Sequence, residues 1–76
     1  LSLAFEDIIL IPESIGNLQY IEKIYLNNNH IEVIPETFCN LPNNCEVYIQ
    51  ENNLCPQYEL ECIDNLIFGD QDCQED

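Results

Sequence analysis

The sequence predicts an α/β solenoid, a coil in which short parallel strands line the concave face and irregular or short-helical segments return behind them. The main observation is a repeat of 23 residues, because a shift of this length places similar residues on one another. The matching positions are mostly apolar and include an asparagine: Ile24, Leu26, Asn29 and Ile31 against Val47, Ile49, Asn52 and Leu54, with Leu1, Leu3, Glu6 and Ile8 one period earlier. Such a repeat indicates stacked units, each of which buries its apolar face only against its neighbours.

The clearest unit covers residues 21–43 and reads Ile-x-x-Ile-x-Leu-x-x-Asn, followed by an apolar return segment marked by Pro35. This unit resembles the leucine-rich repeat, whose consensus is LxxLxLxxN with a similar return segment. The resemblance covers residues 1–56 as about two and a half coils. Residues 57–76 then form a cysteine-containing C-terminal cap with an acidic tail, similar to the end caps of secreted repeat proteins.

Three short strands are expected, near residues 1–4, 23–26 and 46–49. Side chains alternate along a strand, so the apolar ones should point into the core: Ile24, Leu26, Val47 and Ile49. The intervening side chains should line the concave face, and they are Lys23, Tyr25, Asn27, Glu46, Tyr48 and Gln50. Tyr25 and Tyr48 share a phase of the repeat, so they should stand side by side, either as a cross-strand pair that stabilises the sheet or as a recognition platform.

The return segments carry Pro12 and Pro35, which block regular helix before them. After each proline, at residues 13–18 and 36–41, the apolar spacing is that of one short helical turn. The sequence therefore predicts strands on the concave face and short helical turns in the return segments on the opposite face.

The resemblance implies a ladder of buried asparagines. In leucine-rich repeats, the asparagine at this phase, here Asn29 and Asn52, hydrogen-bonds exposed backbone groups of the neighbouring coil. An amide suits this role because it carries both donors and an acceptor. Glu6 occupies the same phase in the first coil, so we expect the ladder to fail there.

Five cysteines in 76 residues indicate an oxidising compartment, and hence an extracellular or cell-surface location. Cys39 and Cys62 differ by 23, which favours a bridge between them if the third coil keeps the period, with Cys55–Cys73 tying down the tail and Cys45 unpaired. The competing scheme joins Cys55 to Cys62 across a tight loop. A metal site is disfavoured because there is no CxxC pair and a single histidine, His30.

The charge restricts the partners. Fifteen acidic residues face a single basic one, Lys23, so nucleic acid and anionic membrane surfaces are poor partners. An acidic surface serves solubility, or else attracts a cationic partner or divalent ions. The carboxylate pairs Glu59 with Glu61 and Asp70 with Asp72 could bind calcium, but neither resembles a complete calcium loop. No apolar segment has the length of a membrane span, and no cofactor or catalytic motif is found.

The first coil is expected to show an open apolar edge. Leu3, Ile8, Ile11 and Ile15 have the spacing of core residues but no preceding coil in this sequence. We therefore expect other protein to cover them, either earlier repeats or a neighbouring subunit of a homo-oligomer or fibre. The sequence thus favours a structural, self-assembling or protein-interaction module without catalysis. The alternative is a recognition module that binds a protein or glycan on the concave face around Tyr25 and Tyr48.

Overall fold

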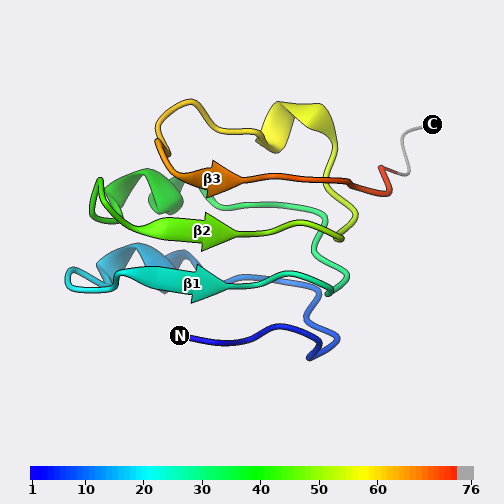
Figure 1. Cartoon of the computed structure of the whole chain (residues 1–76), viewed down its shortest axis with the longest axis horizontal. Coiled ribbons are helices and arrows are strands. Elements are labelled where there is room, and N and C mark those ends of the chain that lie inside the picture. The colour runs from blue at the N-terminus through cyan, green and yellow to red at the C-terminus, as the bar shows by residue number, and fades with distance from the viewer. Residues whose placement is uncertain (74–76) are drawn as a thin grey trace.

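The computed structural model describes residues 1–73 and contains a three-stranded parallel sheet with short 3-10 helices. The order along the chain is η1 (Glu13–Asn17), β1 (Lys23–Tyr25), η2 (Glu36–Asn40), β2 (Glu46–Tyr48), η3 (Pro56–Tyr58) and β3 (Leu66–Ile67). In Figure 1 the three arrows point the same way and lie side by side in the order β1-β2-β3. Residues 74–76, the end of the predicted cap, lie outside the described residues.

The strand register follows the 23-residue repeat between the first two strands. Lys23, Ile24 and Tyr25 pair with Glu46, Val47 and Tyr48. Between β2 and β3 the spacing falls to 19 residues, since Val47 pairs with Leu66 and Tyr48 with Ile67. The sequence missed β3, because the chain returns to the sheet four residues earlier than the repeat predicts (23 − 19).

The strand predicted near residues 1–4 is reduced to a single bridge, Ser2 with Tyr25. This segment runs beside β1 on the side opposite to β2 (Figure 1). The chain turns immediately afterwards, because Phe5 and Asp7 both adopt positive φ values, 59° and 58°. Backbone bonds still join it to β1: the Leu3 amide donates to the Tyr25 carbonyl at 2.7 Å, and the Phe5 amide to that of Asn27 at 3.2 Å.

The two predicted helical turns are confirmed as η1 and η2. Each follows a proline in an extended conformation, Pro12 with ψ 150° and Pro35 with ψ 146°, and each closes with a backbone bond from the next leucine. The two helices pack against each other. A Cβ on Gly16 would lie 2.4 Å from the backbone oxygen of Thr37, so this close approach requires glycine.

The core lies between the sheet and the helices. Its members are the inward residues of the strands together with apolar residues of the return segments: Ile15, Ile24, Leu26, Ile31, Ile34, Phe38, Leu41, Cys45, Val47, Ile49 and Leu54. Ile15 was expected at the open edge, and this expectation is wrong: packing of η1 on η2 leaves it only 8% exposed. Leu3, Ile8 and Ile11, in the first segment of the chain, are half-buried and pack against the core.

Candidate functional site

The outer face of the sheet, which looks away from the core, carries the residues predicted for the concave surface. The register places Lys23 beside Glu46 and Tyr25 beside Tyr48. It also extends the tyrosine row at both ends, to Ser2 and to Ile67. The sequence did not identify Ile67, because its strand departs from the 23-residue period.

The two tyrosines form a stacked pair. Their ring centroids are 4.7 Å apart and the ring planes differ by 12°. The Tyr48 hydroxyl donates a hydrogen bond to the Glu46 carboxylate. This bond, followed by desolvation and by the charge of Glu46, raises the pKa of the Tyr48 phenol above its ordinary value. Glu46 therefore favours the neutral phenol and holds the ring in place.

The pH dependence of Tyr48 follows from this contact. Because the folded chain raises the pKa of Tyr48, it stabilises the neutral phenol, and this contribution is present below about pH 10 and lost as pH rises through the folded value. Replacing Glu46 with glutamine removes the neighbouring charge, so we expect the Tyr48 pKa to fall. Ultraviolet titration of tyrosinate, assigned by difference against Tyr48→Phe, measures it. An unchanged titration, or an equal fall in the control Glu36→Gln, would contradict the assignment.

Asn27 and Gln50, the other predicted members of this surface, are engaged within the chain. The Asn27 side chain donates to the Asn28 side-chain oxygen at 2.8 Å. Gly69 lies against Gln50, because a Cβ added to it would meet the Gln50 Cβ at 2.4 Å. The Gln50 amide oxygen is buried and has no hydrogen-bond partner among residues 1–73. Of the predicted members, Lys23, Tyr25 and Tyr48 therefore remain as the larger side chains at least partly exposed on this face.

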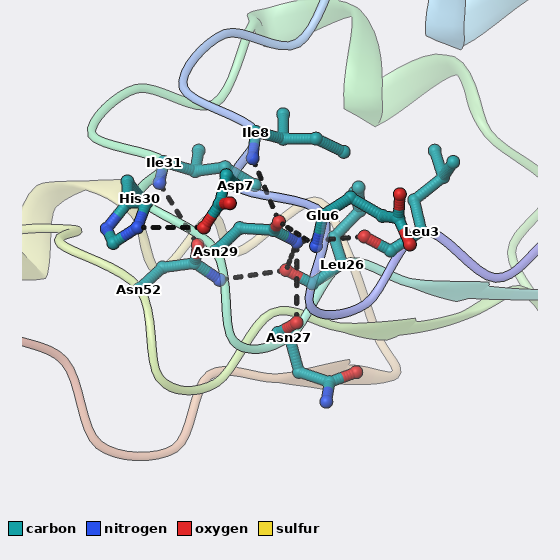
Figure 2. Close-up of polar contacts among 10 residues, drawn as sticks. All are labelled: Leu3, Glu6, Asp7, Ile8, Leu26, Asn27, Asn29, His30, Ile31 and Asn52. Carbon is teal, nitrogen blue, oxygen red and sulfur yellow. Dashed lines mark hydrogen bonds and ion pairs between the residues drawn. The ribbon is translucent and has the colours of Figure 1, made fainter.

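Asn29 joins the first two segments of the chain (Figure 2). It is 5% exposed, and its side-chain oxygen accepts hydrogen bonds from the Glu6 and Ile8 amides, both at 2.9 Å. Its side-chain nitrogen donates to the Leu3 and Leu26 carbonyls, both at 3.0 Å. The ladder therefore reaches the first segment through the backbone of Glu6, although the Glu6 carboxylate itself has no hydrogen bond within the described residues.

Asn52 repeats this arrangement one segment later. Its side-chain oxygen accepts from the Ile31 amide at 3.0 Å, and its nitrogen donates to the Leu26 and Ile49 carbonyls, both at 2.9 Å. Figure 2 shows both asparagines meeting at the Leu26 carbonyl. Each amide thus binds its own strand and the preceding one, which is the role expected for the ladder.

Gln71 is a third member that the sequence missed. Its side-chain oxygen accepts from the Asn52 and Leu54 amides at 3.2 and 3.1 Å. Its nitrogen donates to the Ile49 and Phe68 carbonyls at 2.8 and 2.7 Å. The available signal was the spacing apolar-x-apolar-x-x-amide, which recurs at 24-26-29, 47-49-52 and 66-68-71.

The first eleven residues carry several exposed or half-buried apolar side chains, which we call together the N-terminal edge. Its exposed members are Leu1, Phe5, Ile9 and Leu10, with exposed fractions of 54, 71, 58 and 75%, and its half-buried members are Leu3, Ile8 and Ile11. The sequence identified the half-buried residues, because they follow the repeat. It missed Phe5, Ile9 and Leu10, which lie off the repeat phase. The N-terminal edge thus combines half-buried residues that pack against the core with exposed residues that do not.

Two disulfides close the opposite end. Cys39 bonds Cys62 with Cα atoms 5.4 Å apart, and Cys55 bonds Cys73 with Cα atoms 4.7 Å apart. The structure therefore has the pairing that the spacing favoured and not the Cys55–Cys62 alternative. Cys45 is a buried free thiol, and its burial raises the pKa of the thiol, which keeps it protonated.

The carboxylate pairs considered for calcium are exposed and lie in the last part of the chain. Within residues 1–73 no group of three or more histidine, cysteine, aspartate or glutamate side chains is placed to hold a metal ion. An ion pair joins His30 Nε2 to Asp7 Oδ1 at 3.3 Å, at the solvent surface. None of the described helices is long and apolar enough to cross a membrane.

The chain has no significant match among protein-family models, curated proteins or solved structures.

Proposed function

We propose that this chain is a segment of an extracellular solenoid of the leucine-rich repeat type, which serves as a structural or protein-interaction module without catalysis. The 23-residue register of β1 with β2, and the side-chain amides that join successive segments, support the solenoid. The two disulfides fit a secreted or extracellular protein.

The N-terminal edge is the observation that carries the interaction role. Burying one exposed side chain of this size contributes about 1.5–3 kcal/mol of favourable free energy. Phe5 and Leu10 are 71 and 75% exposed, so covering them with other protein would be strongly favourable. Large exposed apolar patches mark contact sites for other protein, and these residues are the candidates for such a site here. The adjoining strand also has a free side, which is where sheets accept further strands. We assign the contact with other protein to this edge.

The proposal is tested by adding salt, which screens the repulsion between copies of the chain, and by measuring whether the copies then associate through the N-terminal edge. The net charge of −14 keeps copies of the chain apart at low salt, but at about 1 M salt the screening length falls to about 3 Å. We expect the chain then to self-associate through the edge in sedimentation velocity runs, and Leu10→Lys to remain monomeric. The control Val33→Lys, at a 46% exposed position elsewhere, should associate like the parent. Association unaffected by Leu10→Lys, or no association at high salt, would contradict the proposal.

A second candidate is recognition of a protein or glycan on the outer face of the sheet. The stacked tyrosines favour it, because tyrosine offers rigid contact area with a polar tip. However, each ring already uses one face against the other, which leaves less surface than the N-terminal edge presents. Glycan or protein binding that is lost in Tyr25→Ala but kept in Leu10→Lys would favour this candidate instead.

A further inference from the structure

We infer that Asn43 is an N-glycosylation site, which receives an oligosaccharide on its side-chain amide through the uncommon acceptor sequence Asn-x-Cys. This inference rests on the extracellular location in the proposed function, but not on the contact at the N-terminal edge. It draws on the sequence motif, on the free thiol of Cys45 and on the exposed turn that carries Asn43.

The sequence contains two tripeptides of this form. The usual acceptor, Asn-x-Ser or Asn-x-Thr, does not occur in the 76 residues, whereas Asn43-Asn44-Cys45 and Asn53-Leu54-Cys55 both have the form Asn-x-Cys. The group two residues after the asparagine forms a hydrogen bond that orients the acceptor amide, and a thiol does this more weakly than a hydroxyl. A cysteine can serve only while its sulfur carries a proton and is not in a disulfide. The state of the two cysteines therefore distinguishes the two tripeptides.

Cys45 keeps a free thiol, and Cys55 does not. The chain has five cysteines, of which Cys39 is bonded to Cys62 and Cys55 to Cys73, so no cysteine is left to pair with Cys45. An unpaired thiol is mostly protonated at neutral pH. Disulfide formation thus withdraws the thiol of the second tripeptide, while that of the first stays available.

The turn around Asn43 has room for a bulky group. It joins η2 to the start of β2 (Figure 1), and the Cys45 amide closes it by donating to the Pro42 carbonyl at 2.9 Å. Asn43 and Asn44 are both exposed. The Asn43 side chain makes no hydrogen bond within residues 1–73, because its contact with Asn65 uses the backbone carbonyl. A sugar on the Asn43 amide nitrogen therefore removes no hydrogen bond from the fold and lies in solvent.

The second tripeptide lacks such room. Asn53 is half-buried, and Leu54 beside it is fully buried in the core. The Asn53 backbone amide donates to the Ile31 carbonyl at 3.0 Å, which holds this segment against the preceding one. We therefore expect the folded chain to carry the sugar on Asn43 and not on Asn53.

The reaction is a glycosyl transfer from a lipid-linked sugar diphosphate, which attaches the sugar to the asparagine. The Asn43 amide nitrogen attacks C1 of the first sugar, and the bond from C1 to the phosphate oxygen breaks. The amide loses one proton, and the lipid diphosphate leaves with the electron pair of the broken bond. The Cys45 thiol orients the amide and is not consumed, so it is a positioning residue. Because Cys45 is 2% exposed after folding, the transfer takes place before the chain folds.

The test is expression of the full chain in cultured eukaryotic cells, behind an added signal peptide that is removed during secretion. The mass of the chain is measured before and after treatment with an enzyme that releases N-linked glycans and converts the modified asparagine to aspartate. We expect a glycosylated fraction in the parent chain, with the conversion at Asn43. This fraction should be lost in Asn43→Gln and unchanged in Asn53→Gln, which removes the other tripeptide.

Two variants of Cys45 test the role of the thiol. Cys45→Ser has a hydroxyl in its place, so the glycosylated fraction should rise about twofold or more. Cys45→Val keeps an apolar side chain at this buried position but offers no proton, so the glycan should be lost. Because the transfer precedes folding, the glycan is measured in cells and medium together, and the result does not depend on the stability of either variant.

The outcomes separate this inference from the proposed function. A secreted parent chain with both disulfides and no glycan on Asn43 would overturn the inference and leave the extracellular location standing. A glycan on Asn53 as often as on Asn43, or one that persists in Cys45→Val, would also overturn the inference. A secreted chain that forms neither disulfide would contradict the extracellular location, and the inference with it.

Discussion

Replacing Asn52 with alanine should lower the free energy of unfolding by about 3 kcal/mol, because several buried backbone groups lose their hydrogen-bond partner at once. The Asn52 side chain is 2% exposed and is bonded to the Leu26 and Ile49 carbonyls and to the Ile31 amide. Each buried polar group left without a hydrogen-bond partner lowers the stability of the fold by about 1–3 kcal/mol. This is a large share of the 5–15 kcal/mol typical of a whole domain, so the variant should be studied by urea unfolding at low temperature.

Two further variants separate lost hydrogen bonds from lost volume. Asn52→Asp keeps the shape and the acceptor but removes both donors, so it should not restore stability. Asn44→Ala, at an exposed position whose side chain makes no hydrogen bond within residues 1–73, should leave the unfolding midpoint nearly unchanged. If Asn52→Ala unfolds at the same urea concentration as the parent, the amide ladder does not stabilise this chain.

Removing the Cys39–Cys62 disulfide by the paired change to serine should destabilise the chain by about 2–4 kcal/mol. The bridge links positions 23 residues apart, and it ties η2 to the segment that leads into β3. Its loss should therefore loosen the contact of β2 with β3 first. The Val47 and Ile49 amides, which donate to Asn65 and Ile67, should then exchange faster than the Leu26 amide, which donates to Tyr48.

The disulfide pairing itself can be checked on the parent chain. The unreduced chain is cleaved next to glutamate and aspartate, and the peptides are mapped by mass. They should show Cys39 joined to Cys62 and Cys55 joined to Cys73. A peptide that joins Cys55 to Cys62 would contradict the structure, and uniform acceleration of exchange in the serine variant would contradict the local role of the bridge.

The sequence predicted the strand pairing and the helical turns where the chain repeats itself, and it missed the third strand, where the period changes. The 23-residue period correctly placed β1 against β2 and the turns η1 and η2, because backbone register and apolar spacing both follow the period. After η3 the chain returns to the sheet after 19 residues, so β3 and Gln71 were out of phase with the repeat. Neither could be found by extending the period, although the local apolar and amide spacing remained visible.

The surface was less predictable than the core. The pairing of Tyr25 with Tyr48 followed from their shared phase, but the shielding of Gln50 by Gly69 depends on the unexpected third strand. At the edge, spacing alone could not distinguish Ile15, which η2 covers, from Leu3 and Ile8, which remain half-buried. Phe5 and Leu10 lie outside the repeat pattern, and their exposure depends on the turn that follows the first segment.

Site-resolved amide hydrogen exchange of the whole chain tests most directly that the amide ladder ends in an open, unpaired edge. The Glu6 and Ile8 amides, bonded to Asn29, and the Leu3 and Phe5 amides, bonded to the β1 segment, should exchange slowly. The Ser2 and Ala4 amides should exchange close to the rate of an unstructured chain. Slow exchange at Ser2 and Ala4 would mean that the edge is already paired, and fast exchange at Glu6 and Ile8 would mean that the ladder does not reach it; either result would contradict the account.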